Sequence, residues 1–196
     1  MKFDALSAKL GVEINRELLK LAMTHRSYSY EHGNIPNNER LEFLGDSVLG
    51  FVVTSHIYET LTALPEGEMT KVKNAVVSAR ALAIVAADLG LGEYLLLGKG
   101  ELATDGRNKP NLLADAFEAI LGAIFLDSDY VTVSAVILKL YDELLSDASP
   151  DDSLKDFKSQ LQELLQKKGH SLPIYELIKT KGQDHNAVFY VSCHIK

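Results

Sequence analysis

The sequence predicts an all-helical domain followed by a short helix and two strands. Over residues 1–146 the apolar residues recur at helical spacing, and no stretch shows the alternation that predicts a half-buried strand. The period changes after Pro173, where residues 174–178 and 187–195 are predicted to form two strands. Residues 147–152 are polar and include a proline, which is typical of a linker between two domains.

Capping and breaking residues mark the ends of the expected helices. Gly11 separates the first two helices, and Pro110 stands at the first turn of the most apolar helix, where proline is tolerated. The Gly-rich, charged segment 98–108 matches no nucleotide-binding fingerprint, so we expect a flexible loop there. The expected helices cover residues 3–10, 15–21, 37–61, 69–88, 110–126 and 131–145, with an amphipathic helix over 154–168 after the linker.

Composition limits the class of protein. A chain of 196 residues has room for one domain of about 150 residues and a smaller second one. Apolar residues make up 46% of the chain, enough for a core, but no apolar run is long enough to span a membrane. No signal peptide is visible, and the single Cys193 excludes an internal disulfide. We therefore expect a cytoplasmic protein with no membrane partner.

The net charge of −7 argues against nucleic-acid binding at first sight, because phosphate contacts usually require an excess of Lys and Arg. The charge is unevenly distributed. Residues 1–150 carry 13 basic and 21 acidic residues, whereas residues 151–196 carry 7 basic and 6 acidic ones. The excess of acids therefore lies in the helical part of the chain.

Three carboxylates form a line on the expected helix 37–61. Glu39, Glu42 and Asp46 are spaced i, i+3 and i+7, which places them on one side of a helix. Like charges stacked in this way destabilise a helix by about a few tenths of a kcal/mol per pair. Taken alone, such a trio is more often a solvated acidic face than a site.

A second helix changes that balance. Asp115 and Glu118 are the only charged residues within the apolar stretch 112–126, and a carboxylate in an apolar helix must be paired, neutralised or bound to a cation. If this helix crosses the first, four acids converge with Glu42 and Asp46. Two such charges about 4 Å apart repel by roughly 4 kcal/mol at an effective dielectric constant near 20. Hard divalent cations would relieve this repulsion, and Mg²⁺ or Mn²⁺ fits better than zinc because no His or Cys joins the set.

These motifs resemble the ribonuclease III family. Residues 38–46, Asn-Glu-Arg-Leu-Glu-Phe-Leu-Gly-Asp, are similar to the family signature. The likeness continues through residues 24–28, 66–69, 98–101 and 113–118, in family order and at family spacing. The resemblance implies a ribonuclease III-like helical bundle, which we expect to be an endonuclease domain over residues 1–147.

The tail resembles the opening two-thirds of a double-stranded RNA-binding domain. The likeness rests on residues 157–159, 161–163, Gln166 and 182–185. The family domain continues with a third strand and a second helix, so we expect a partial domain over residues 154–196, after a linker at 148–153. The sequence leaves open whether this is a fragment of a longer protein or a vestigial tail. An open sheet with one apolar face half uncovered should be poorly stable alone.

The resemblance also implies an activity. The family consists of endoribonucleases that hydrolyse double-stranded RNA with two Mg²⁺ ions, with Mn²⁺ as a substitute, and leave 5′-phosphate and 3′-hydroxyl ends with a short 3′ overhang. Processing of ribosomal RNA precursors and of other structured transcripts, including messenger RNA, is the expected task. By resemblance, the metal ligands are Glu42, Asp46, Asp115 and Glu118, of which Asp46 and Glu118 are the catalytic pair, and the supporting acids near the scissile strand are Glu39 and Glu66.

Several residues keep two interpretations. The family works as a homodimer, and Phe43 and Leu44 are the residues expected at its interface, although both could be core residues. His25 fits a structural histidine better than a ligand. Family RNA contacts match Ser159, Gln162, Glu163, Gln166 and His185, with an ordinary solvated helix and loop as the less favoured alternative.

Two rival functions also remain open. One is a non-catalytic RNA-binding or assembly protein with the same fold, which the presence of all the expected acids disfavours. The other is a structural helical protein with a chance acidic stripe, whose stability would not respond to divalent ions.

Overall fold

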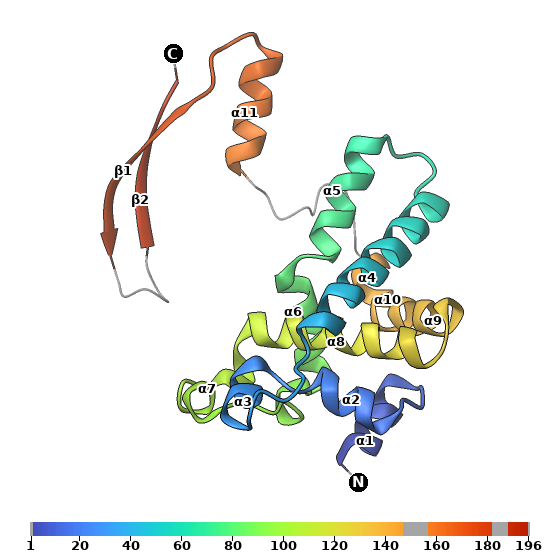
Figure 1. Ribbon diagram of the computed structural model, residues 1–196. Helices are drawn as coiled ribbons and strands as arrows, with labels where there is room; N and C mark the ends of the chain where they lie inside the picture. Colours follow the sequence, from blue (N-terminus) through green and yellow to red (C-terminus); the bar gives the residue numbers. More distant parts are fainter. Residues whose placement is uncertain (1, 147–156, 182–187, 196) are drawn as a thin grey trace. The chain divides into compact units, whose positions relative to one another are not determined.

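The computed structural model describes residues 2–146, 157–181 and 188–195 (Figure 1). The chain divides into two compact units, Met1–Asp151 and Asp152–Lys196. The first unit is helical, and the second contains one helix and a two-stranded sheet, which confirms the fold class that the sequence predicts. Within the described ranges, no helix combines the length and the apolar character needed to cross a membrane.

The first unit follows the expected order of helices, with several additional short ones. Its helices are α1 (Lys2–Leu10), α2 (Arg16–Ala22), α3 (Arg26–Glu31), α4 (Glu39–Thr60), α5 (Glu66–Val76), α6 (Ala79–Asp88), α7 (Lys99–Ala103), α8 (Pro110–Asp127), α9 (Tyr130–Leu140) and α10 (Asp142–Ser146), with 3₁₀ turns η1 (Leu91–Glu93) and η2 (Gly106–Asn108).

Helix α8 forms the centre of the core. Its residues are almost continuously apolar, and most of them are buried, including Phe117, Ile120 and Leu121 with no exposed surface. Helices α2, α4, α6 and α9 pack against it, and α4 makes the most extensive contact (Figure 1). A helix that is apolar on nearly all sides is expected to be surrounded in this way.

The crossing of α4 and α8 is unusually close because two glycines meet there. A Cβ atom on Gly45 would overlap the backbone carbonyl group of Glu118, and one on Gly122 would overlap that of Leu41. Backbone therefore lies against backbone at this point, and only glycine allows it. This contact places the acidic residues of the two helices side by side.

Two of the expected long helices are in fact interrupted. The segment 69–88 contains α5 and α6, because the Ser78 hydroxyl accepts a hydrogen bond from Ala81 N–H (3.3 Å) and caps a new helix. The segment 131–145 is divided between α9 and α10 at Tyr141. Helix α4 begins at Glu39, two residues after the expected start, where Asn37 accepts a hydrogen bond from Glu39 N–H (3.1 Å) and Asn38 makes no capping hydrogen bond through its side chain.

The expectation of a flexible loop over residues 98–108 was wrong. This segment contains α7 and η2, and its side chains hold it in place. Lys109 forms an ion pair with Glu101 (2.6 Å), and Arg107 donates to the carbonyl oxygens of Gly92 (2.6 Å) and Leu95 (3.2 Å). The second feature that the sequence did not predict is α3, which begins directly after His25.

The second unit consists of α11 (Phe157–Lys167), β1 (Ile174–Lys181) and β2 (Val188–His194). The strands are antiparallel, with Ile174 opposite His194 and an irregularity in the register between Leu177 and Lys179. Many apolar side chains of the sheet are exposed, for example Leu177 at 61%. The predicted linker and residues 182–187, between the two strands, lie outside the described residues.

Candidate active site

The α4–α8 crossing brings three of the predicted metal ligands together. One carboxylate oxygen from each of Glu42, Asp115 and Glu118 lies within 4.8 Å of the others, and all three residues are partly buried. Asp46 lies one turn further along α4 and is exposed, and its negative charge acts on Glu118. The arrangement follows from the sequence, because i, i+3 and i, i+4 spacing on two crossing helices aligns these acids along the line of contact.

Burial and mutual repulsion make this cluster costly to ionise. Burial, followed by the charges of Asp46, Glu42 and Asp115, raises the pKa of Glu118 to about 8. Burial also raises the pKa of Glu42, with Asp115 and Glu39 adding to the effect. Burial is likewise the main cause of the raised pKa of Asp115. Carboxylates held together against this cost are a candidate functional site, since a cation would stabilise all of them at once.

The donor set fits a hard divalent cation. All of the clustered ligand atoms are carboxylate oxygens, and Mg²⁺ and related ions prefer oxygen ligands. Soft metals prefer thiolate or imidazole, and neither group belongs to this cluster in the described residues.

The two supporting acids lie in different places. Glu39 is the first residue of α4, where it forms an exposed ion pair with Arg26 (3.7 Å) and contributes to the raised pKa of Glu42. Glu66 is the first residue of α5 and accepts a hydrogen bond from the Thr70 hydroxyl (2.9 Å). Glu39 therefore acts on the cluster through Glu42, and neither Glu39 nor Glu66 is one of its members within the described residues.

The predicted interface residues also differ from each other. Phe43 is 79% exposed and thus is not a core residue, whereas Leu44 is partly buried against the core. Two further aromatic residues of α4, Phe51 and Tyr58, are also exposed and were not predicted from the sequence. Their spacing from Phe43 places all three within a quarter of the helix circumference, a periodicity that could have identified them.

The predicted RNA contacts lie mostly on α11. Gln162 is partly buried and Gln166 is exposed. Ser159 and Glu163 belong to the same helix, but their side chains are outside the described part of the structure, as is the whole of His185. These roles therefore stay predictions.

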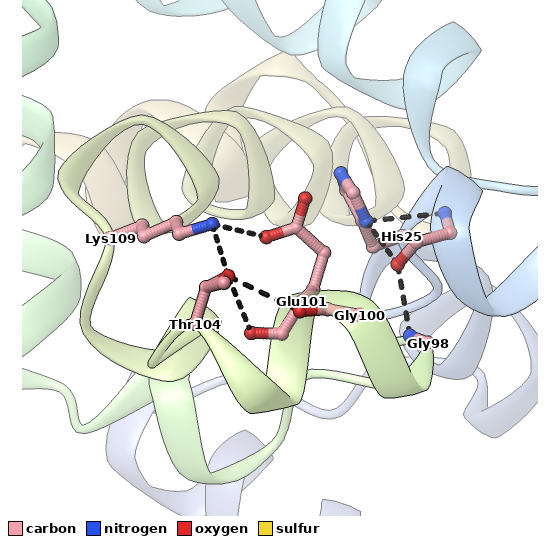
Figure 2. Close-up of polar contacts among 7 residues, drawn as sticks. His25, Gly98, Gly100, Glu101, Thr104 and Lys109 are labelled. Atoms are coloured by element: carbon pink, nitrogen blue, oxygen red, sulfur yellow. Dashed lines mark hydrogen bonds and ion pairs between the residues drawn. The ribbon is translucent and has the colours of Figure 1, made fainter. Parts of the chain in front are cut away.

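A polar wall beside the cluster was not anticipated from the sequence. The His25 ring accepts a hydrogen bond at Nδ1 from Ser27 N–H (3.2 Å) and so caps α3, in agreement with a structural role. The Ser27 hydroxyl also contacts this nitrogen (2.8 Å) and accepts from Gly98 N–H (2.9 Å). Figure 2 shows these hydrogen bonds beside Glu101, which lies between His25 and Lys109. Two segments far apart in the sequence thus form one wall.

Comparison with known proteins gives two family matches. Residues 15–144 match the family described as Ribonuclease-III-like, and residues 157–196 match the double-stranded RNA binding motif. The chain is 48% identical over 192 residues to Ribonuclease 3 of Leifsonia xyli, covering 98% of this chain and 81% of that protein. It is 46% identical over 186 residues to Ribonuclease 3 of Thermobifida fusca, covering 95% and 77%.

Solved structures give the same picture. The nuclease domain of ribonuclease III from Campylobacter jejuni is similar at 35% identity with a TM-score of 0.67, over 71% of this chain and 93% of that one. A second structure of that domain, described in terms of a flexible region involved in dimer formation, has a TM-score of 0.68 at 35% identity, over 73% and 98% of the two chains. Dicer from Pichia stipitis is 26% identical with a TM-score of 0.53, over 92% of this chain and 80% of that one.

Proposed function

Because this chain belongs to the ribonuclease III family, we propose that it is an endoribonuclease that hydrolyses phosphodiester bonds in double-stranded RNA. The observation that carries the proposal is the partly buried cluster of Glu42, Asp115 and Glu118 at the α4–α8 crossing. Clustered carboxylates with raised pKa values fit a site for divalent ions better than a solvated acidic face.

Mg²⁺ is the proposed cofactor, with Mn²⁺ as a substitute. Glu42, Asp46, Asp115 and Glu118 would hold two ions, with Asp46 and Glu118 closest to the chemistry. When bound, such ions supply an activated water and stabilise negative charge on the phosphate and the leaving 3′ oxygen. The part that the chain itself plays is to hold its carboxylates in position before substrate arrives. Glu118, with a pKa near 8, must lose its proton to become a ligand.

The remaining residues have proposed roles in binding RNA. Glu39 and Glu66 would help to place the scissile strand. On α11, Ser159, Gln162, Glu163 and Gln166 would contact the duplex together with His185, recognising mainly its shape and its 2′-hydroxyl groups. We assign the endonuclease domain to residues 1–147, the linker to 148–153 and a partial RNA-binding domain to 154–196.

The products and cellular task follow from the same proposal. Two sites in a homodimer would cut both strands with a short offset, leaving 5′-phosphate and 3′-hydroxyl ends with a 3′ overhang. The substrates would be ribosomal RNA precursors and other structured transcripts, including messenger RNA, in the cytoplasm.

Cleavage of a long, perfectly paired RNA at low salt with Mg²⁺ tests the activity. We expect cuts in both strands that disappear with EDTA and with Glu118→Gln. If neither this chain nor a version extended by a complete RNA-binding domain cuts the duplex, the non-catalytic alternative replaces the proposal.

Sedimentation at micromolar concentration tests the homodimer. The exposed Phe43 and its neighbour Leu44 are the proposed contact residues, so we expect a dimer that Phe43→Asp converts to a monomer. A monomeric unsubstituted chain would contradict the two-strand model of cleavage.

A further inference from the structure

A pocket of about 470 Å³ opens between α3 and α7. His25 and Arg26 line it from the start of α3, and Gly100 and Glu101 line it from α7. The pocket adjoins the proposed active site, because Arg26 pairs with Glu39 at the start of α4 (3.7 Å) and Glu101 pairs with Lys109 directly before α8 (2.6 Å). The proposed function assigns no role to this pocket.

His25 presents one hydrogen-bond donor to the pocket. The residue is only 9% exposed, and Nδ1 accepts from Ser27 N–H, so a neutral ring carries its proton on Nε2. Burial lowers the pKa of His25, so the ring is neutral near pH 7. Within the described part of the chain, Nε2 has no hydrogen-bond partner.

Glu101 presents an acceptor to the same pocket. Its Oε2 atom is held by the Lys109 ammonium group (2.6 Å), and Lys109 is fixed in turn by the Thr104 hydroxyl (2.8 Å). In Figure 2 the other carboxylate oxygen of Glu101 points away from Lys109, toward the side of His25. The hydrogen bond from Lys109 lowers the pKa of Glu101, so this oxygen accepts hydrogen bonds and donates none.

This pairing selects the chemistry of the ligand. Two carboxylates, Glu31 and Glu101, line the pocket against one cation, Arg26, and this excess of negative charge disfavours a phosphate group there. A hydroxyl group fits both residues, because it can accept from Nε2–H of His25 while it donates to Glu101. Along a duplex, the group of this kind on the backbone is the ribose 2′-hydroxyl, which distinguishes RNA from DNA.

We propose that His25 and Glu101 together bind one ribose 2′-hydroxyl of the substrate strand near the scissile phosphate, and thereby select RNA over DNA at that nucleotide. This inference rests on the proposed function, since it concerns the same substrate. It makes His25 both the cap of α3 and a specificity-determining residue.

The test is a series of RNA duplexes, each with a single 2′-deoxy nucleotide at one position near the cut site. For the unsubstituted protein we expect that a 2′-deoxy nucleotide at one position lowers kcat/KM by about tenfold, because the hydrogen bonds to His25 and Glu101 are both lost. Positions that contact α11 could show penalties of their own. The series needs no variant of the protein and therefore does not depend on the folding of one.

A variant then identifies the residue responsible. His25→Asn keeps a side-chain acceptor for Ser27 N–H, as Asn is a good helix cap, but removes the donor to the pocket. We expect the 2′-deoxy penalty at that one position to shrink to about twofold, with the penalties elsewhere unchanged. His32→Asn is the matched control, because His32 lies at the other end of α3, is exposed and stacks on Tyr28.

The outcomes separate the two proposals. No cleavage of the all-RNA duplex would contradict the proposed function itself. Cleavage without any sensitive position, or a sensitive position whose penalty is the same in His25→Asn, would overturn the inference about the pocket alone. If His25→Asn melts far below the unsubstituted protein, Glu101→Gln serves in the same experiment, with the same expected reduction.

Discussion

The two units differ in how they present their functional side chains. At the α4–α8 crossing, backbone contact at Gly45 and Gly122 holds carboxylates together in partly buried positions. In the second unit, the proposed contact residue Gln166 is exposed, and so are apolar residues of the sheet such as Leu177. The difference shows that burial shifts the protonation of the proposed catalytic groups, while the proposed binding surface relies on side chains that stay open to solvent.

The largest expected effect is the difference in cleavage activity between a variant of the first unit and a variant of the second. Glu118→Gln should reduce cleavage by about a thousandfold or more, because it removes a proposed metal ligand from the centre of a preorganised site. Gln166→Ala should reduce it by less than about tenfold, since it removes an exposed and uncharged side chain. Single-turnover cleavage of the same duplex measures both, and equal losses would contradict the division of roles.

The next effect concerns the contact between α4 and α8. Gly45→Ala should destabilise the protein by about 2–3 kcal/mol, because its Cβ overlaps the carbonyl of Glu118. Gly50→Ala is the matched control in the same helix. It meets no atom within 4 Å, and should stabilise the helix by about 0.5–1 kcal/mol. Denaturant unfolding monitored by circular dichroism measures the difference, and similar values for both variants would show that the crossing can relax.

A further effect on stability is expected from pH and divalent ions. The pKa of Glu118 rises from 4.5 to about 8 on folding, so the folded state binds more protons between these values and stability falls as pH rises through this window. In EDTA, Tm should therefore be lower at pH 8 than at pH 5. Millimolar Mg²⁺ or Mn²⁺ should raise Tm at pH 8, because an ion that binds only the folded state stabilises it.

The variant Glu118→Gln serves as the control for that experiment. It should reduce both the fall in Tm with pH and the response to the ions. A Tm that is independent of pH and of divalent ions would support the chance acidic stripe instead.

The smallest effect is expected in the second unit. Leu177→Ala should change the free energy of unfolding by less than about 0.5 kcal/mol, since the side chain is 61% exposed. A loss above about 1 kcal/mol in thermal or chemical unfolding would show that another surface covers this face of the sheet.

The sequence predicts most of the fold because its signals are local. The apolar run of α8, the proline at its first turn and the alternation in the tail each specify an element without reference to the rest of the chain. Breaks within helices were harder to predict. Ser78 starts α6 only because its hydroxyl caps that helix, and the apolar periodicity continues through the break.

The carboxylate cluster could also be predicted, since helical spacing and the family resemblance both indicated the acids that meet. The polar wall formed by His25 and Glu101 could not be predicted, because it depends on hydrogen bonds between residues far apart in the sequence. Gly98 N–H donates to the Ser27 hydroxyl, and Lys99 N–H donates to Glu31 (2.8 Å) across about 70 residues. Nothing in the local pattern of residues 98–108 indicates these partners.

The close crossing of α4 and α8 has a consequence for the rate of folding. Gly45 and Gly122 lie far apart in the sequence, so their contact closes a large loop and is expected to form in a slow, late step. The same step brings Glu42, Asp115 and Glu118 together, and their repulsion opposes it. Refolding should therefore be faster when divalent ions are present from the start than when they are added afterwards.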